Sequence, residues 1–200
     1  MLDTQSVSLY FDLGSPYAYL AVARAQAVLG RPPDLEPVLL GAIFRLRGGG
    51  SWSQTARRAS EIAEVERRAA AYGLPAMAWP EGWPLDGLRT MRAATWAKQN
   101  DAIDAFARAA FRHQFVDGRD LSGVDALAEV AQEVGLSGDD MRAAIESPAV
   151  KDQLKSATGH AWDIGVRGVP TVRVGPRLFY GDDQLEAVKA VLAATELVSD

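Results

Sequence analysis

The chain has 200 residues, of which 48% are hydrophobic and 24% charged, so it carries enough apolar side chains to bury a substantial core. Its formal net charge of -5 at pH 7 argues against nucleic acid and anionic membranes as partners, because both attract basic surfaces. It contains no cysteine, which excludes disulfide bonds, thiolate metal sites and redox chemistry by thiols of its own.

The sequence also lacks the patterns of membrane insertion and of metal binding. No stretch approaches the roughly 20 apolar residues that span a bilayer, and the N-terminus lacks a basic segment followed by an apolar one. We therefore expect a cytoplasmic protein. The two histidines, His113 and His160, lie far apart in segments with helical patterns, so we predict no metal site.

The first 40 residues have the pattern of a strand, a helix and a second strand. Residues 7–11 alternate and are rich in β-forming side chains. Ser15 is a favourable N-cap, Pro16 suits the first helical position, and Gly30 ends the helix. Residues 36–40 follow as a strand, and the intervening helix predicts a right-handed crossover to a parallel partner.

The middle of the chain, from about residue 53 to residue 164, has the composition of a helical block. Alanine, arginine and glutamate dominate, and clusters of β-branched residues disappear. Prolines and glycines interrupt residues 79–84, which we expect to form a loop rich in buried aromatic side chains. Helices are predicted at about 53–72, 87–99, 101–115, 122–134, 138–146 and 148–164.

The β pattern returns after residue 165. Residues 171–174 and 177–180 flank a Gly-Pro turn and predict a hairpin, and residues 183–194 predict a final helix. Strands at both ends of the chain and helices between them indicate an α/β fold with an all-helical insertion.

Five segments together resemble the thioredoxin-fold family of 2-hydroxychromene-2-carboxylate isomerases and kappa-class glutathione transferases. The similarity covers nearly the whole chain. It rests on FDLGSPYAYL at 11–20, LLGAIF at 39–44, the Trp83-Pro84 loop, GVPT at 168–171 and FYGDD at 179–183.

The resemblance implies a thioredoxin-like domain formed by residues 1–45 and 165–200, with residues 46–164 as a helical insertion domain. It also implies glutathione as the cofactor, and a homodimer is compatible with it. In related disulfide oxidoreductases a cysteine occupies the position of Ser15, so this cysteine-free chain is closer to the members that use glutathione.

Ser15 is the expected catalytic residue. A hydroxyl at the N-terminus of a helix lies among unpaired N–H groups and at the positive end of the helix dipole, where anions are favoured. A glutathione thiol placed there would be stabilised as the thiolate. The alternative is that Ser15 only caps its helix.

The resemblance assigns the glutathione site to two further segments. It implies a cis bond before Pro170, with the backbone of Val169 pairing with glutathione as an added strand would. Asp182 and Asp183 begin the last helix, where acids are favourable caps, and the resemblance places Asp183 on the γ-glutamyl amine. The arginine that commonly follows this acid in the isomerases is Gln184 here.

The substrate side of the predicted site consists of Arg45 and Trp83. Arg45 matches a lysine that the resemblance places near the substrate, and Trp83 belongs with Trp52 and Trp79 to a predicted aromatic wall that could instead be core. An asparagine expected after Arg45 is replaced by glycines at 48–50. The arginine pairs at 57–58 and 67–68 are expected to be solvated.

The resemblance implies a glutathione-dependent isomerase of an unsaturated aromatic keto acid of the 2-hydroxychromene-2-carboxylate type. Two alternatives stay open. One is a kappa-like transferase or peroxidase, which would share the glutathione site, and the other is a non-catalytic binding module on the same fold.

Overall fold

The computed structural model describes residues 6–199, with side chains as far as Thr195. At its centre is a four-stranded sheet with the strand order β2-β1-β3-β4. Two strands precede the helical block and two follow it, namely β1 (Val7–Phe11), β2 (Asp34–Pro37), β3 (Thr171–Val174) and β4 (Arg177–Tyr180).

The sheet is mixed, because the two halves of the chain contribute strands of different direction. β1 pairs with β2 in parallel, and Leu9 lies opposite Leu35. β1 pairs with β3 antiparallel, and β3 and β4 form the predicted hairpin. The parallel pair confirms the crossover that the sequence predicted through the first helix.

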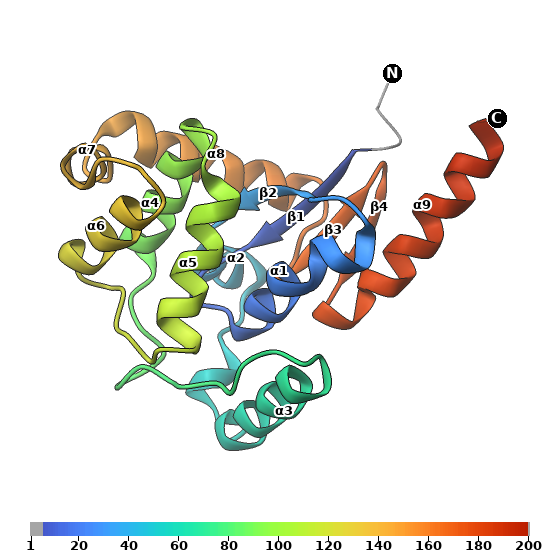
Figure 1. Cartoon of the computed structure of the whole chain (residues 1–200), viewed down its shortest axis with the longest axis horizontal. Helices are drawn as coiled ribbons and strands as arrows, with labels where there is room; N and C mark the ends of the chain where they lie inside the picture. The colour runs from blue at the N-terminus through green and yellow to red at the C-terminus, as the bar shows by residue number, and fades with distance from the viewer. Residues whose placement is uncertain (1–5, 200) are drawn as a thin grey trace.

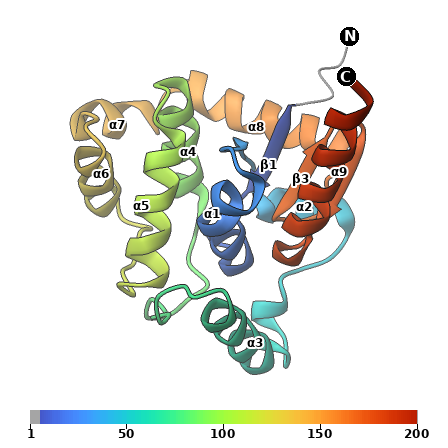
Figure 2. The same ribbon diagram turned by 45° about the vertical axis from the view of Figure 1, so that its right-hand side comes forward.

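Helices lie around this sheet, and a group of further helices extends beyond one side of it (Figures 1 and 2). In both views α3 lies apart at the lower end, α9 flanks the sheet, and α4, α5, α6 and α7 lie on the side away from α9. The helical elements are α1 (Pro16–Leu29), α2 (Leu40–Arg47), the short 3-10 helix η1 (Trp52–Gln54), α3 (Arg58–Ala71), α4 (Leu88–Gln99), α5 (Ile103–Phe115), α6 (Val124–Glu133), α7 (Gly138–Ala144), α8 (Pro148–Asp163), the 3-10 helix η2 (Asp182–Gln184) and α9 (Leu185–Ser199).

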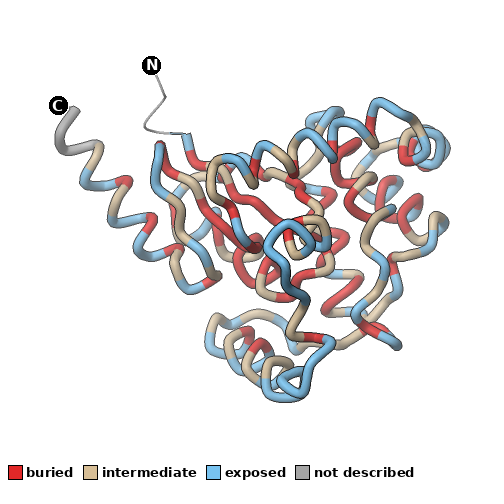
Figure 3. The backbone as a smooth tube through the Cα atoms, turned by 180° about the vertical axis from the view of Figure 1, so that it is seen from behind, coloured by how far each residue is buried: buried red, intermediate tan, exposed pale blue. Residues whose placement is uncertain are grey.

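The two faces of the sheet belong to two cores, because successive side chains of a strand point to opposite faces. Leu9 and Phe11 are fully buried in the main core, which includes residues of α1, α4, α5 and α9. Tyr10 lies in a smaller core with Ile43 of α2 and Ala161 of α8. Seen from behind, buried backbone runs through the strands and the helices beside them, whereas α3 and α9 are largely exposed (Figure 3).

The structure confirms the α/β class and the helical insertion, which comprises α4 to α8. Three element boundaries differ from the prediction. The second strand ends at Pro37 and Leu40 begins α2, a helix that the sequence did not predict. The helix expected at 53–72 is η1 followed by α3, and the last helix begins with η2 and extends to Ser199.

The strand predicted at 36–40 ends at Pro37, so the second half of that prediction was wrong. Leu39 and Leu40 are apolar and directly follow a strand, so the sequence pattern alone extended the strand through them. The backbone N–H of Val38 still donates to the carbonyl of Phe11, but that of Leu40 donates to the carboxylate of Asp12, so the chain turns into α2.

The predicted division into two domains at residues 45 and 165 stays a prediction. α2 crosses the first boundary, and residues 1–5 and 200 lie outside the described residues. Within residues 6–199, no helix combines the length and apolar character needed to cross a bilayer.

Candidate functional site

A cavity of about 1220 Å³ lies where β1 ends and α1 begins. This volume exceeds what a drug-sized ligand needs, so a tripeptide and a second small molecule could share it. The structure brings together in its wall all the residues that the sequence assigned to a site, namely Ser15, Arg45, Trp83, Val169, Pro170, Asp182 and Asp183. Their roles stay predictions.

Ser15 lies at the N-terminus of α1, as the sequence predicted. Its side-chain oxygen accepts a hydrogen bond from the N–H of Ala18 at 3.3 Å, and Pro16 occupies the first helical turn. Because the oxygen accepts from Ala18, the hydroxyl proton remains for a group in the cavity. The positive end of the helix dipole favours a negative charge at the same place.

The Val169-Pro170 bond is cis, which confirms the sequence prediction. The N–H of Gly181 donates to the carbonyl of Pro170 at 3.0 Å and closes the turn on one side. Among the residues that the structure describes, none pairs with the backbone N–H or C=O of Val169. These groups therefore resemble the edge of a strand that an extended peptide can extend.

Gly168 allows the ring of Tyr180 to lie against this turn. A Cβ atom at Gly168 would come 2.8 Å from the ring of Tyr180. Tyr180 is 66% exposed and contributes to the cavity wall, so the aromatic ring forms part of the rim.

Asp12 is a buried carboxylate in the cavity wall that the sequence analysis did not assign to the site. One of its oxygens accepts from the N–H of Gly14 and the other from the N–H of Leu40, both at 2.8 Å. Burial raises the pKa of Asp12 to about 6, although these two hydrogen bonds favour the charged form. An acid after a strand could have indicated this role, but the same residue type is common in turns.

The acidic pair at the start of η2 is divided between two environments. The carboxylate of Asp182 is 1% exposed, and it accepts hydrogen bonds from Arg68 and Tyr72, each at 2.9 Å. Burial raises the pKa of Asp182, whereas the hydrogen bond from Tyr72 and the charge of Arg68 lower it. The carboxylate of Asp183 is 51% exposed and faces the cavity rim.

The pair of arginines at 67–68 is not uniformly solvated, so that expectation was wrong for one member. The side chain of Arg67 is 66% exposed and bonds only to Glu64 among the described residues. Arg68 is 25% exposed, bonds to Glu64 and Asp182, and contributes to the cavity wall.

Arg45 lies on α2 and contributes to the cavity wall. No carboxylate in the described part of the chain forms an ion pair with it, so its charge is available to an anion. Arg47, two residues further along α2, also contributes to the wall. The three glycines at 48–50 follow, and Gly48 ends the helix with a φ of 73°.

The predicted aromatic wall is only partly present. Trp52 and Trp83 line the cavity together with Tyr17, and the rings of Trp52 and Trp83 lie 5.4 Å apart. Trp83 is 4% exposed, so little of its ring reaches the cavity. Trp79 packs behind Trp83 with a ring separation of 4.8 Å and does not line the cavity.

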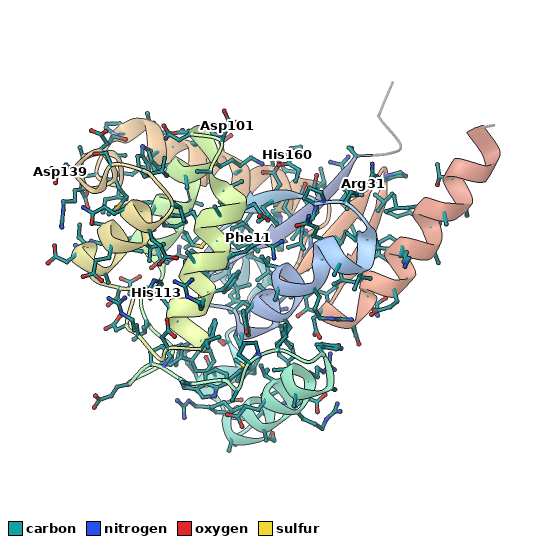
Figure 4. The ribbon with its side chains drawn as sticks, in the orientation of Figure 1. Phe11, Arg31, Asp101, His113, Asp139 and His160 are labelled. Atoms are coloured by element: carbon teal, nitrogen blue, oxygen red, sulfur yellow. The ribbon has the colours of Figure 1, made fainter. Side chains whose placement is uncertain are left out.

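The histidines do not belong to this site. His113 is on α5, near its lower end in Figure 4, His160 is on α8, and neither lines the cavity. His113 contacts Glu133 at 2.8 Å on the surface of the helical insertion. Within residues 6–199, no three potential metal ligands cluster together.

The cavity wall has groups that fit the parts of glutathione. Ser15 and the end of α1 suit a thiolate, and the open backbone of Val169 suits the cysteinyl peptide group. Asp183 suits the γ-glutamyl ammonium group. Each fit follows from the donor or acceptor that the wall presents.

Comparison with known proteins gives the same fold. Residues 6–193 match the family described as the DSBA-like thioredoxin domain. The 2-hydroxychromene-2-carboxylate isomerase of Sphingobium xenophagum is 28% identical over 202 residues, which cover 94% of this chain and 98% of that protein.

Solved structures are similar over nearly their whole length. A 2-hydroxychromene-2-carboxylate isomerase has a TM-score of 0.85 at 20% identity, covering 94% of this chain and 95% of that one. The cytosolic disulfide reductase DsbM from Pseudomonas aeruginosa, solved with GSH, has a TM-score of 0.63 at 19% identity and covers 96% and 98%. At these identities the structures establish the fold. The chain is a member of the DSBA-like thioredoxin domain family, with a thioredoxin-like sheet and a helical insertion.

Proposed function

We propose that this chain is a glutathione-dependent isomerase of an unsaturated aromatic keto acid of the 2-hydroxychromene-2-carboxylate type. The observation that carries the proposal is the hydroxyl of Ser15, which caps a helix at the wall of a large cavity in a chain without cysteine. The relative from Sphingobium xenophagum, similar over its full length, supports the same reaction class.

Glutathione would supply a thiolate that adds to the conjugated double bond, allows rotation about the resulting single bond and leaves again by elimination. Ser15 donates a hydrogen bond at the sulfur position and, with the helix dipole, favours the anionic form. The backbone of Val169 holds the peptide part, and Asp183 holds the γ-glutamyl amine. The carboxylate of Asp182 is already bonded to Arg68 and Tyr72, so it does not bind glutathione directly. Asp182 instead holds the turn that carries Asp183.

Arg45 is the proposed partner of the substrate carboxylate. Arg45 has no carboxylate partner among the described residues and contributes to the cavity wall, and a guanidinium binds a carboxylate through paired hydrogen bonds. Trp52 and the exposed edge of Trp83 flank the space in which the aromatic ring would lie. We place this activity in the cytoplasm, where glutathione is the abundant thiol. A homodimer stays a prediction, and light scattering can measure the oligomeric state.

The test combines binding with product analysis. Calorimetry should detect binding of reduced glutathione, and 2-hydroxychromene-2-carboxylate should change its absorbance spectrum only when protein and catalytic glutathione are both present. Accumulation of a glutathione conjugate or of oxidised glutathione would instead identify a transferase or peroxidase. Absence of glutathione binding would favour the non-catalytic module.

An insulin-reduction assay is the matched negative test. The pure protein should not reduce insulin disulfides, because it has no cysteine that could be oxidised. Reduction by the protein alone would contradict the proposal.

A further inference from the structure

The wall of the cavity contains an ion cluster that joins α3 to the start of α9. Arg68 of α3 reaches across 114 residues of sequence to donate a hydrogen bond to Asp182 at 2.9 Å. Its Nε atom donates to Glu64 at 2.7 Å, and its guanidinium lies 5.6 Å from the ring centre of Tyr17. The guanidinium is therefore held in one place by three neighbours from three elements.

Arg68 lines the cavity and retains one guanidinium nitrogen without a partner among the described residues. Its Nε and Nη1 atoms have partners, whereas no described residue accepts a hydrogen bond from Nη2. The side chain is 25% exposed and contributes to the cavity wall, so this nitrogen can reach a ligand. A guanidinium with two open N–H groups on one nitrogen is suited to a carboxylate.

Asp183 presents the complementary charge beside it. Its carboxylate is 51% exposed and lies 3.7 Å from Nη1 of Arg68, which is too long for a hydrogen bond. A ligand ammonium group could therefore bind Asp183 without breaking a strong interaction. A Cβ atom at Gly181 would come 2.6 Å from Oδ1 of Asp183, so the glycine allows this carboxylate to lie over its own turn.

The charges around this point favour a zwitterion over a simple anion. Asp182 and Glu64 already neutralise much of the charge on Arg68, and Asp183 adds a further negative charge. A ligand that carried only a negative charge would be repelled by these carboxylates. A ligand with an ammonium group on the carbon that bears its carboxylate would also be attracted by them. An α-amino acid group carries both charges at this spacing.

We propose that Arg68 binds the α-carboxylate of the γ-glutamyl residue of glutathione while Asp183 binds its α-ammonium group. This inference rests on the proposed function, because it presumes that glutathione occupies the cavity.

The test measures the affinity of wild type and two variants for each of three ligands. The ligands are glutathione, a decarboxylated analogue (4-aminobutyryl-cysteinyl-glycine) and a deaminated analogue (glutaryl-cysteinyl-glycine), each titrated by calorimetry. Arg68→Gln should weaken glutathione and the deaminated analogue at least about tenfold, the loss expected for one charge-assisted hydrogen bond. The decarboxylated analogue should bind wild type and Arg68→Gln equally. Asp183→Asn should weaken glutathione and the decarboxylated analogue and spare the deaminated one.

Arg67→Gln is the matched control, because Arg67 bonds to the same Glu64 but does not line the cavity. It should leave all three affinities unchanged. Arg68→Lys, which keeps the charge near Asp182, should weaken only the two ligands that carry the carboxylate, and it serves if the glutamine variant is unstable.

The outcomes separate this inference from the proposed function. If Arg68→Gln weakens all three ligands by one factor, or none of them, Arg68 only supports the turn and the inference is wrong, although glutathione still binds. If wild type binds none of the three ligands, the proposed function itself is wrong.

Discussion

Ser15 has two roles that a single substitution can separate. Its oxygen caps α1, and its proton is available to a thiolate in the cavity. Ser15→Ala should raise the pKa of bound glutathione's thiol by about 1 to 2 units, because a hydrogen bond to a charged group is worth about 1.5–3 kcal/mol. Glutathione affinity measured with the thiol protonated should change little, because the peptide is held elsewhere. An ultraviolet thiolate titration measures the shift.

Ser147→Ala is a closely matched control for the capping role. Ser147 also precedes a proline at a helix start, and its oxygen accepts from the N–H of Val150 at 3.3 Å. Its hydroxyl donates to the carbonyl of Ala144, and it does not line the cavity. Both variants should lose about 1 kcal/mol of stability. Equal titration curves for wild type and Ser15→Ala would reduce Ser15 to a helix cap.

Asp12 should make the stability of the fold depend on pH in a direction unusual for an acid. Its folded pKa of about 6 is above its ordinary value of 3.8, so the native state holds this proton more tightly than the unfolded state does. The ionisation of Asp12 removes about 3 kcal/mol of stability in total as pH rises, most of it between these two pH values, and the loss levels off above pH 6.

Asp12→Asn tests this dependence by removing the titration. The stability of wild type minus that of Asp12→Asn should fall by about 2 kcal/mol from pH 4 to pH 6.5 in urea denaturation. The comparison with the variant cancels carboxylates of opposite behaviour, such as Glu133, whose pKa is lowered by hydrogen bonds from Arg112 and His113. A difference that is constant with pH would show that Asp12 titrates normally.

Part of this site could be predicted from the amino-acid sequence alone. Ser15 could be recognised because a Ser-Pro pair after a strand is a local pattern for a helix start. Arg68 could not, because Arg67 and Arg68 have the same chemistry and the same neighbour, Glu64, and only the fold brings Asp182 to one of them. Asp12 was missed because its second partner, the N–H of Leu40, belongs to a helix that the sequence did not predict.

At the scale of the elements, α2 is the helix whose position depends most on its neighbours. It has eight residues and no side-chain cap of its own. Its start is held instead by Asp12, which accepts from Leu40, and by Thr158 of α8, which accepts from the N–H of Leu39 at 3.0 Å. A helix held by distant residues has no local sequence pattern, which is why the longer helices were predicted and α2 was not.

Thr158→Val should loosen α2 without changing the volume of the side chain. Thr158 is 4% exposed, and the substitution removes its partly buried hydrogen bond from the N–H of Leu39, at an expected cost of about 1 kcal/mol. Because Arg45 lies on α2, the affinity for an anionic substrate should also fall. Ser156→Ala, at an exposed position of α8, is the control and should change neither quantity.

At the scale of the whole molecule, aromatic contacts join the sheet to the helical insertion. Phe111 of α5 packs against Phe11 of β1, with ring centres 6.0 Å apart, and against Tyr19 of α1 at 5.9 Å. Phe11 lies near the centre of the molecule in Figure 4. One core therefore extends through both parts of the chain, and we expect them to unfold together.

Phe111→Ala should destabilise both parts at once. The loss of a fully packed aromatic ring costs about 3–5 kcal/mol. Far-ultraviolet circular dichroism and tryptophan fluorescence should still report one shared transition at a lower denaturant concentration. Leu46→Ala is the control, since Leu46 is 55% exposed and its loss should shift stability by less than about 0.5 kcal/mol. Two separate transitions in the wild type would contradict the shared core.

The exposed side chain of Leu46 also offers a position for a spectroscopic reporter. It lies on α2 between Arg45 and Arg47, which both line the cavity, but it does not line the cavity itself. In a chain without cysteine, Leu46→Cys would carry the single thiol of the molecule, so a maleimide fluorophore would attach there alone. Its emission could then follow ligand entry in stopped-flow experiments without prior removal of competing thiols.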